Sequence, residues 1–185
     1  TRAGQREGSR VTERRKREVI LASSAGFCFG VKKAVETVYR EAEESKDTVY
    51  SYGAIIHNEE VVRDLTEKGV VVFEDEDAAA KVRALPEEAG TIILRSHGVG
   101  PEVYRLCEEK KLRIVDTACP FVNKIHRIVQ TENRKGRRVL IVGDPKHPEV
   151  EGIRAWGRAD TAVIRDEEEF LALQIPKEMP LSVVA

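Results

Sequence analysis

Residues 91–100, TIILRSHGVG, show most clearly the pattern from which the fold class follows. Thr91 to Leu94 form a short β-branched and aliphatic run without polar alternation, and a glycine-containing loop leads from it into a helical pattern. An unalternating run of this length is typical of a strand that is buried on both faces of a parallel sheet. Parallel strands need crossover connections, which are usually helices, so the helical pattern after the loop agrees with this interpretation.

The same pattern recurs along the chain. Short apolar runs occur at residues 19–22, 48–52, 70–73, 91–94, 112–115, 139–142, 161–164 and 181–184. Helical patterns lie between them, near residues 31–44, 58–68, 77–84, 101–110, 119–134, 149–157 and 166–173. Strands that alternate with helices predict an α/β protein with small parallel sheets flanked by helices.

The spacing divides the chain into two units of similar construction. About four strands precede Asp116 and three follow it, so we expect lobes at residues 19–118 and 119–185. The run 181–184 has no crossover helix after it, and the chain begins with Thr1 rather than Met. We therefore expect the second lobe to be truncated and the sequence to be a fragment.

Composition excludes several classes of function. The chain has a net charge of −1, which predicts no bulk attraction to nucleic acid or to an anionic membrane, and no apolar run is long enough to span a bilayer. Residues 1–18 hold seven basic and three acidic side chains without apolar periodicity, which predicts a disordered basic tail. A nucleic-acid-binding arm or a transit peptide is an alternative for this tail. Three widely spaced cysteines and no secretory signal indicate a reducing, cytoplasmic location.

Five loops that follow predicted strands carry a cysteine or a histidine. In open α/β sheets, ligands bind beyond the carboxyl ends of the strands, so these loops are the candidate functional site. The residues are Cys28 in GFCFG, His57 in GAIIHN, His97 in RSHGV, Cys119 in DTACP and His147 in GDPKHPE.

Each loop also has a purely structural interpretation. Asn58 is a helix cap candidate, residues 96–98 fit a tight turn, residues 116–120 fit a capped helix start, and Glu149 suits the positive end of a helix dipole. That all five loops are purely structural is much less plausible than that any single loop is. Cys107, on the apolar stripe of a helix, and His126, in the middle of a helix, are instead interpreted as structural.

The chemistry of these residue types leaves alternatives open. A cysteine just before a helix is stabilised as a thiolate, a metal ligand or nucleophile. Two cysteines and a histidine could hold zinc, although no close Cys-x-x-Cys pair is present, whereas iron–sulfur clusters accept thiolates from separate loops. The three histidines near helix N-termini suit a small anionic group such as a diphosphate, and Glu149 is placed to move a proton.

Taken in order, the motifs resemble those of the 4-hydroxy-3-methylbut-2-enyl diphosphate reductase family. The similar stretches are GFCFGV (26–31), HNEEVV (57–62), SHGV (96–99), DTACP (116–120) and HPEVEG (147–152). The resemblance runs from about Val19 to the C-terminus and leaves out residues 1–18.

This resemblance implies three similar α/β lobes around a central [4Fe-4S] cluster that is held by three cysteines. Cys28 and Cys119 would be two of the ligands, while His57, His97 and His147 would bind the diphosphate and Glu149 would deliver protons. The implied reaction is the two-electron reductive removal of an allylic hydroxyl in the methylerythritol phosphate route to isoprenoids, with ferredoxin or flavodoxin as electron donor.

The sequence departs from the family pattern beyond residue 185. The third lobe, the third ligand cysteine and a threonine-bearing loop expected just after Ala185 are not in the sequence, and Cys107 does not match the missing ligand. We therefore expect the chain alone to be inactive. A non-catalytic α/β module that binds a nucleotide, or zinc on Cys28, Cys119 and one histidine, is the alternative, and binding of nucleic acid by the basic tail is a further one.

Overall fold

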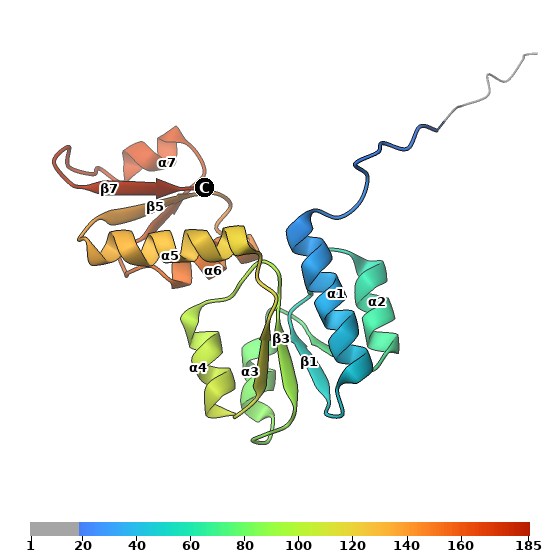
Figure 1. The fold of residues 1–185 in the computed structure, drawn as a ribbon. Coiled ribbons are helices and arrows are strands. Elements are labelled where there is room, and N and C mark those ends of the chain that lie inside the picture. Colours follow the sequence, from blue (N-terminus) through green and yellow to red (C-terminus); the bar gives the residue numbers. More distant parts are fainter. Residues whose placement is uncertain (1–18) are drawn as a thin grey trace, which may run out of the picture.

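The computed structural model describes residues 19–185, which form two parallel sheets flanked by helices (Figure 1). The first sheet has the order β2-β1-β3-β4, and each neighbouring pair is parallel. Its strands are β1 (Val49–Tyr52), β2 (Val71–Phe73), β3 (Thr91–Leu94) and β4 (Arg113–Asp116). Its helices are α1 (Phe29–Glu44), α2 (Glu59–Glu67), α3 (Ala78–Ala84) and α4 (Pro101–Glu109). The predicted α/β class is confirmed.

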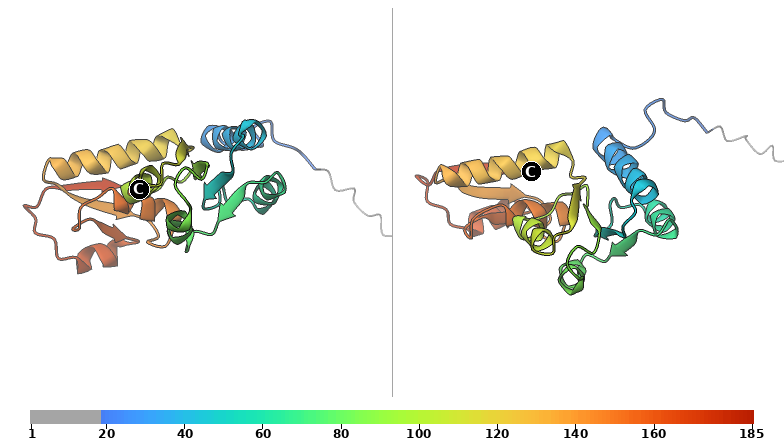
Figure 2. Two further views of the ribbon diagram at one scale, coloured as in Figure 1. Left: turned by 90° about the horizontal axis from the view of Figure 1, so that it is seen from below. Right: turned by 60° about the horizontal axis from the view of Figure 1, so that its bottom comes forward.

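Helices cover both faces of the first sheet, as the apolar character of its strands predicts. Ile93 of β3 packs in the core beneath α1 and α2, while Ile92 and Leu94 pack in the core beneath α3 and α4. All three side chains are fully buried. Figures 1 and 2 show the two helix pairs on opposite sides of the strands. Because both faces are buried, a ligand can reach the sheet at the carboxyl ends of its strands, where the loops lie.

The second sheet has the order β6-β5-β7 and is also parallel. It consists of β5 (Arg138–Val142), β6 (Ala162–Ile164) and β7 (Leu181–Val184), with helices α5 (Pro120–Arg134), α6 (Pro148–Ala155) and α7 (Glu167–Ala172). Val129 of α5, Ile153 of α6, and Val139 and Ile141 of β5 form its core. The helix α5 connects β4 of the first sheet to β5 of the second.

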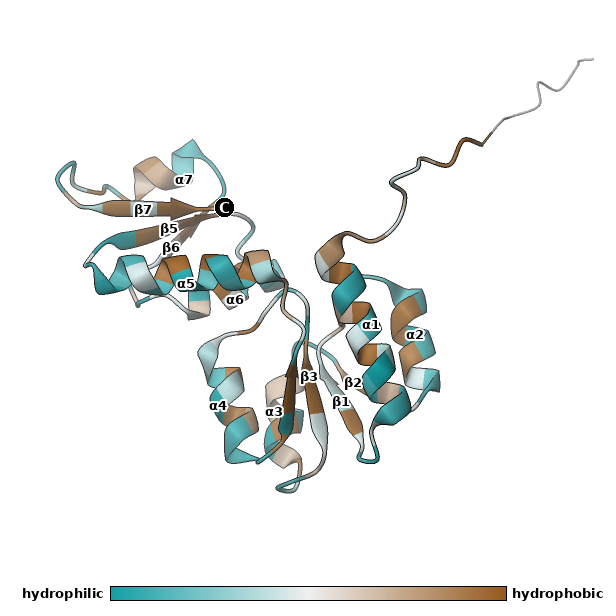
Figure 3. Ribbon diagram, viewed as in Figure 1, coloured by the Kyte–Doolittle hydropathy of each residue, from teal (hydrophilic) through white to brown (hydrophobic). Residues whose placement is uncertain are grey.

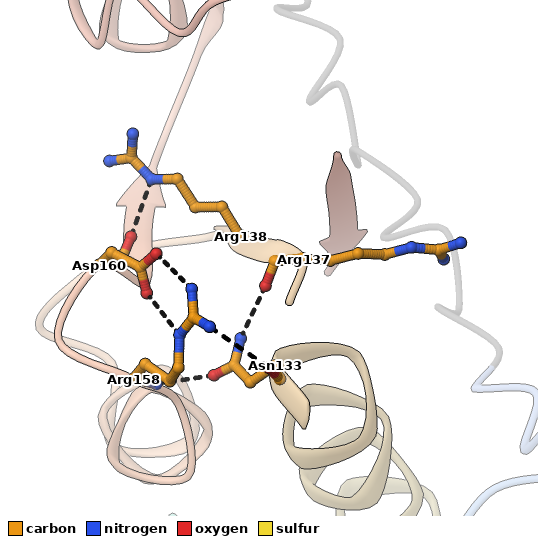
Figure 4. A network of polar contacts seen from close by, with 5 residues as sticks. All are labelled: Asn133, Arg137, Arg138, Arg158 and Asp160. Atoms are coloured by element: carbon orange, nitrogen blue, oxygen red, sulfur yellow. Dashed lines mark hydrogen bonds and ion pairs between the residues drawn. The ribbon is translucent and has the colours of Figure 1, made fainter. Parts of the chain in front are cut away.

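A polar network stabilises the second sheet at the start of β5 (Figure 4). Asn133, near the end of α5, accepts a hydrogen bond from the Arg158 amide at 2.7 Å and donates one to the Arg137 carbonyl at 3.2 Å. The Arg158 guanidinium binds both carboxylate oxygens of Asp160, whose carbonyl accepts a bond from Arg138 Nε at 2.8 Å. The network fixes the start of β5 against the loop before β6.

The strand predicted at residues 19–22 is wrong. Residues Val19, Ile20 and Leu21 are 92%, 83% and 83% exposed and have no strand structure. In Figure 3 this hydrophobic segment runs away from the folded part. The physical reason is the lack of a partner: a strand needs neighbouring backbone groups for its hydrogen bonds, and this segment pairs with neither edge of the first sheet, β2 or β4.

Among residues 19–185, no helix has the length and apolar character that crossing a membrane requires. The predicted basic tail, residues 1–18, lies outside the described residues.

Candidate functional site

Three histidines from separate loops meet at the carboxyl ends of the strands. The rings of His57 and His97 have centroids 4.6 Å apart, and the ring of His147 lies 6.1 Å from His57 and 6.0 Å from His97. His57 follows β1, His97 follows β3, and His147 follows β5 of the second sheet. These three residues, named here the histidine cluster, therefore join loops from both sheets.

Hydrogen bonds hold the loops of the first sheet in a fixed relation. Ser96, buried directly before His97, donates from its hydroxyl to the Ile55 carbonyl at 2.8 Å, and its own carbonyl accepts the Cys119 amide at 2.9 Å. Ser96 thus links the loops of His57, His97 and Cys119. Thr117 adds a bond from its hydroxyl to the Leu94 carbonyl at 2.6 Å.

His57 lies at the entrance to α2. The interpretation of Asn58 as the helix cap is confirmed, because its side chain accepts a hydrogen bond from the Val61 amide at 3.1 Å. Capping by Asn58 leaves the exposed His57 imidazole available for another role. A recess of about 470 Å³ opens beside His57, and the apolar side chains of Ala54, Ile56 and Val62 contribute to its lining.

His97 is the half-buried member of the cluster. Burial lowers its pKa to about 4, with further lowering by His57, Arg95 and His147 and an opposing effect of Asp75. Arg95 is itself buried and forms an ion pair with Asp75. The Nδ1 atom of His97 is buried and has no hydrogen-bond partner among the described residues. A neutral ring can offer a single N–H to an anion at neutral pH.

His147 caps α6. Its Nδ1 accepts a hydrogen bond from the Glu149 amide at 3.2 Å, so a neutral ring carries its proton on Nε2 and can donate there. Glu149 lies in the first turn of α6, where the free amides and the helix dipole favour negative charge. The same features attract an anionic ligand, and here they are joined by imidazole donors.

The two predicted metal ligands occupy equivalent positions at helix starts. Cys28 is the N-cap of α1 and Cys119 is the N-cap of α5, and neither side chain makes a capping hydrogen bond. The Cys119 sulfur lies 2.7 Å from the place that a Cβ on Gly30 would occupy, two residues after Cys28, so a larger residue at position 30 would require the Cys119 side chain to shift. Two uncommitted thiols at neighbouring helix starts suit thiolate ligation of a metal centre.

A metal site made only of described residues was the zinc alternative for Cys28, Cys119 and one histidine. Within residues 19–185, no group of three His, Cys, Asp or Glu side chains is arranged to hold a metal ion. The same finding applies to Cys28 and Cys119 as cluster ligands, so their role in a metal centre stays a prediction.

Cys107 and His126 have the buried positions that the helical pattern predicts. Cys107 is fully buried in α4, and burial raises the pKa of its thiol to about 11. His126 is buried in α5, and burial lowers its pKa to about 4.

Three residues that bind the loops of the histidine cluster or support them were not predicted from the sequence. They are Arg95, Ser96 and Trp156, whose indole donates to the Val99 carbonyl at 2.9 Å. A polar pair directly after an apolar strand was a usable signal for Arg95 and Ser96, because polar groups at a buried strand end need partners. Trp156 gave no local signal.

Similar proteins carry the name of the family that the motifs resemble. A relative from Caldanaerobacter subterraneus subsp. tengcongensis is 42% identical over 153 residues, and one from Geobacter metallireducens is 43% identical over 169 residues. These matches cover 82% and 91% of this chain, and 51% and 56% of the relatives. Both relatives are named 4-hydroxy-3-methylbut-2-enyl diphosphate reductase, so the resemblance inferred from the motifs is confirmed.

Solved structures show the same fold. The E-1-hydroxy-2-methyl-but-2-enyl-4-diphosphate reductase from Plasmodium falciparum matches with a TM-score of 0.79 at 28% identity, over 88% of this chain and 49% of that one. A structure of (E)-4-hydroxy-3-methyl-but-2-enyl diphosphate reductase, described as the terminal enzyme of the non-mevalonate pathway, matches with a TM-score of 0.72 at 35% identity, over 90% and 57%.

The chain spans about half the length of the curated relatives that it matches. A family model described as LytB protein matches residues 19–185. Because this match covers all the described residues, the chain belongs to the LytB protein family.

Proposed function

We propose that the complete protein reductively removes the hydroxyl of 4-hydroxy-3-methylbut-2-enyl diphosphate in isoprenoid biosynthesis. In this reaction the allylic C–O bond breaks and a C–H bond forms, two electrons and two protons enter, and the oxygen leaves as water. The products are isopentenyl and dimethylallyl diphosphates. The observation that carries the proposal is the meeting of three histidine rings, 4.6–6.1 Å apart, beside loops that bear two uncommitted thiols.

In this proposal the histidine cluster holds the diphosphate. His147 donates from Nε2 because its Nδ1 is occupied by the Glu149 amide, and His97 donates as a neutral ring. The N-terminal amides of α2 and α6 add positive potential at the same place. Ser96 keeps the loops of His57 and His97 at a fixed separation, so the site is organised before the ligand arrives.

Glu149 is the proposed proton donor. It follows His147 by two residues and is half-buried in the first turn of α6, at the end of the helix where the diphosphate would bind. A carboxyl group there can protonate the departing oxygen, which leaves much more readily as water than as hydroxide.

Cys28 and Cys119 would supply two of the three thiolates of a [4Fe-4S] cluster, and the third cysteine is expected beyond residue 185. When bound, such a cluster supplies electrons and a Lewis-acidic iron for the hydroxyl oxygen. We further propose residues 19–118 and 119–185 as the first two of three lobes, a cytoplasmic location, and ferredoxin or flavodoxin as the electron donor. The chain alone is expected to be inactive.

The test is turnover by the complete protein, purified without oxygen and supplied with a chemical reductant and the allylic diphosphate. The proposal predicts consumption of the substrate and a raised KM in the His57→Ala variant, because the histidine binds the diphosphate. The control is Glu60→Ala, which removes an exposed side chain that pairs with Arg63 on the same helix. Absence of turnover in a cluster-loaded protein would overturn the proposal.

A further inference from the structure

The two sheets are joined at a contact between backbones. The loop after His97 packs on α6, where a Cβ on Gly152 would lie 3.3 Å from the Gly98 carbonyl oxygen and a Cβ on Gly100 would lie 2.5 Å from the Ala155 Cβ. Gly98 has φ of +74°, and a Cβ there would lie 2.6 Å from the His126 Cε1 atom. Glycine at these places lets the loop approach α6 and α5 more closely than larger side chains would permit.

Trp156 holds this contact together. It is the C-cap of α6, and its indole Nε1 donates a hydrogen bond of 2.9 Å to the Val99 carbonyl, 57 residues earlier in the chain. The indole also stacks on His126 of α5, with ring centroids 5.5 Å apart and planes inclined by 27°, and lies 6.1 Å from the ring of Tyr104 of α4. Trp156 therefore contacts elements of both sheets.

The position of Trp156 on α6 connects this contact to the site. The helix begins directly after His147 and ends directly before Trp156, so eight residues, about 12 Å of rigid helix, separate the two. The loop that accepts the Trp156 hydrogen bond is the loop that carries His97. Anchoring one end of α6 to this loop determines where the other end places His147 relative to His97, with ring centroids 6.0 Å apart.

We propose that Trp156 is a positioning residue for diphosphate recognition. Its hydrogen bond to Val99 and its stacking on His126 set the separation of His97 and His147, so that both rings can reach one diphosphate group. This inference rests on the proposed function, because it takes the histidine cluster as the diphosphate site.

The experiment compares the complete protein with its Trp156→Phe variant, which keeps an aromatic ring on His126 and removes the N–H. We expect the KM for the allylic diphosphate and the inhibition constant of inorganic pyrophosphate to rise together by about 2- to 10-fold, as the loss of one hydrogen bond implies. We expect kcat to stay within about twofold, because Trp156 does not touch the reacting atoms.

The control is Tyr39→Phe. It removes a side-chain hydrogen bond of 2.5 Å to Asp64, between α1 and α2 and away from the contact of the two sheets. If Trp156 contributes to stability alone, Tm should be lower in both Trp156→Phe and Tyr39→Phe, and the inhibition constant of inorganic pyrophosphate should be unchanged in both. That result would overturn the inference.

Gly152→Ala is a second test if Trp156→Phe does not fold. Its Cβ displaces α6 from the Gly98 carbonyl by a few tenths of an ångström, so the same rise in KM without loss of kcat is expected. Wild-type constants in this variant would contradict the positioning role. A wild-type protein that neither turns over nor binds inorganic pyrophosphate would instead refute the proposed function, which separates the two failures.

Discussion

The imidazole rings of His57 and His97 lie 4.6 Å apart and are inclined by 42°, although 40 positions separate them in the sequence. This proximity is produced by parallel pairing of β1 and β3, which places the carboxyl ends of both strands at the same edge of the sheet. Two imidazoles so close together disfavour a second positive charge, so His57 contributes, after burial, to the lowered pKa of His97.

The first prediction concerns the pH dependence of stability. Burial lowers the pKa values of His97 and His126 from 6.5 to about 4. Between pH 6.5 and pH 4 the unfolded chain binds more protons than the folded chain. The free energy of unfolding is therefore highest above pH 6.5, as far as these two histidines are concerned, and it falls as pH decreases toward 4. Urea unfolding of the chain at several pH values, followed by the fluorescence of its one tryptophan, measures this fall.

The control for this effect is His126→Gln, which cannot titrate. Its free energy of unfolding should fall less between pH 7 and pH 5 than that of the wild type. Equal falls in the two proteins would show that protonation of His126 does not oppose folding.

The second prediction concerns Ser96. Ser96→Ala removes the buried hydrogen bond from its hydroxyl to the Ile55 carbonyl, so we expect a loss of about 1–3 kcal/mol in the free energy of unfolding. The matched control is Thr66→Ala, which removes a hydroxyl-to-carbonyl bond of 2.9 Å on the exposed surface of α2 and should cost less than about 1 kcal/mol. Equal losses in the two variants would mean that Ser96 does not link the loops as described.

The third prediction concerns thiol reactivity. Cys28 is exposed and Cys119 is partly exposed, whereas Cys107 is fully buried and burial raises its pKa to about 11. A thiol-specific chromogenic reagent should therefore modify two of the three cysteines in the folded chain, and the third only after addition of denaturant. Reaction of all three at one rate under native conditions would contradict the buried position of Cys107.

The fourth prediction tests the proton donor. In the complete protein, Glu149→Gln should lower kcat by about 10²- to 10⁴-fold without loss of the cluster, because an amide cannot deliver the proton. The control is Glu151→Gln, since a side chain two residues further along a helix points about 200° away and should leave kcat within about twofold. Wild-type kcat in Glu149→Gln would remove Glu149 from the mechanism.

Much of the fold could be predicted from the sequence because burial on both faces leaves a strong local pattern. The run from Thr91 to Leu94 is fully buried at every position, as its composition implies. The equally apolar run at residues 19–22 was wrongly predicted to be a strand, because no local feature reveals whether a strand has a neighbour to pair with. Pairing is a property of the whole sheet.

The histidine cluster followed from topology, since each histidine comes after a predicted strand in one kind of loop. The hydrogen bonds that fix the loops of the cluster could not be predicted from the sequence, because Ser96 and Ile55 are 41 positions apart and Trp156 and Val99 are 57 apart. The motifs contain Gly98 and Gly152, yet the close approach that requires them depends on how the loop meets α6.

The most direct test of the account is a determination of iron and acid-labile sulfide in the complete protein, purified without oxygen, beside its Cys28→Ser, Cys119→Ser and Cys107→Ser variants. We predict about four iron and four sulfide per wild-type chain, a loss of both in the first two variants, and their retention in Cys107→Ser. Zinc or no metal in the wild type, or an intact cluster in either of the first two variants, would contradict the assignment of these loops to an iron–sulfur reductase.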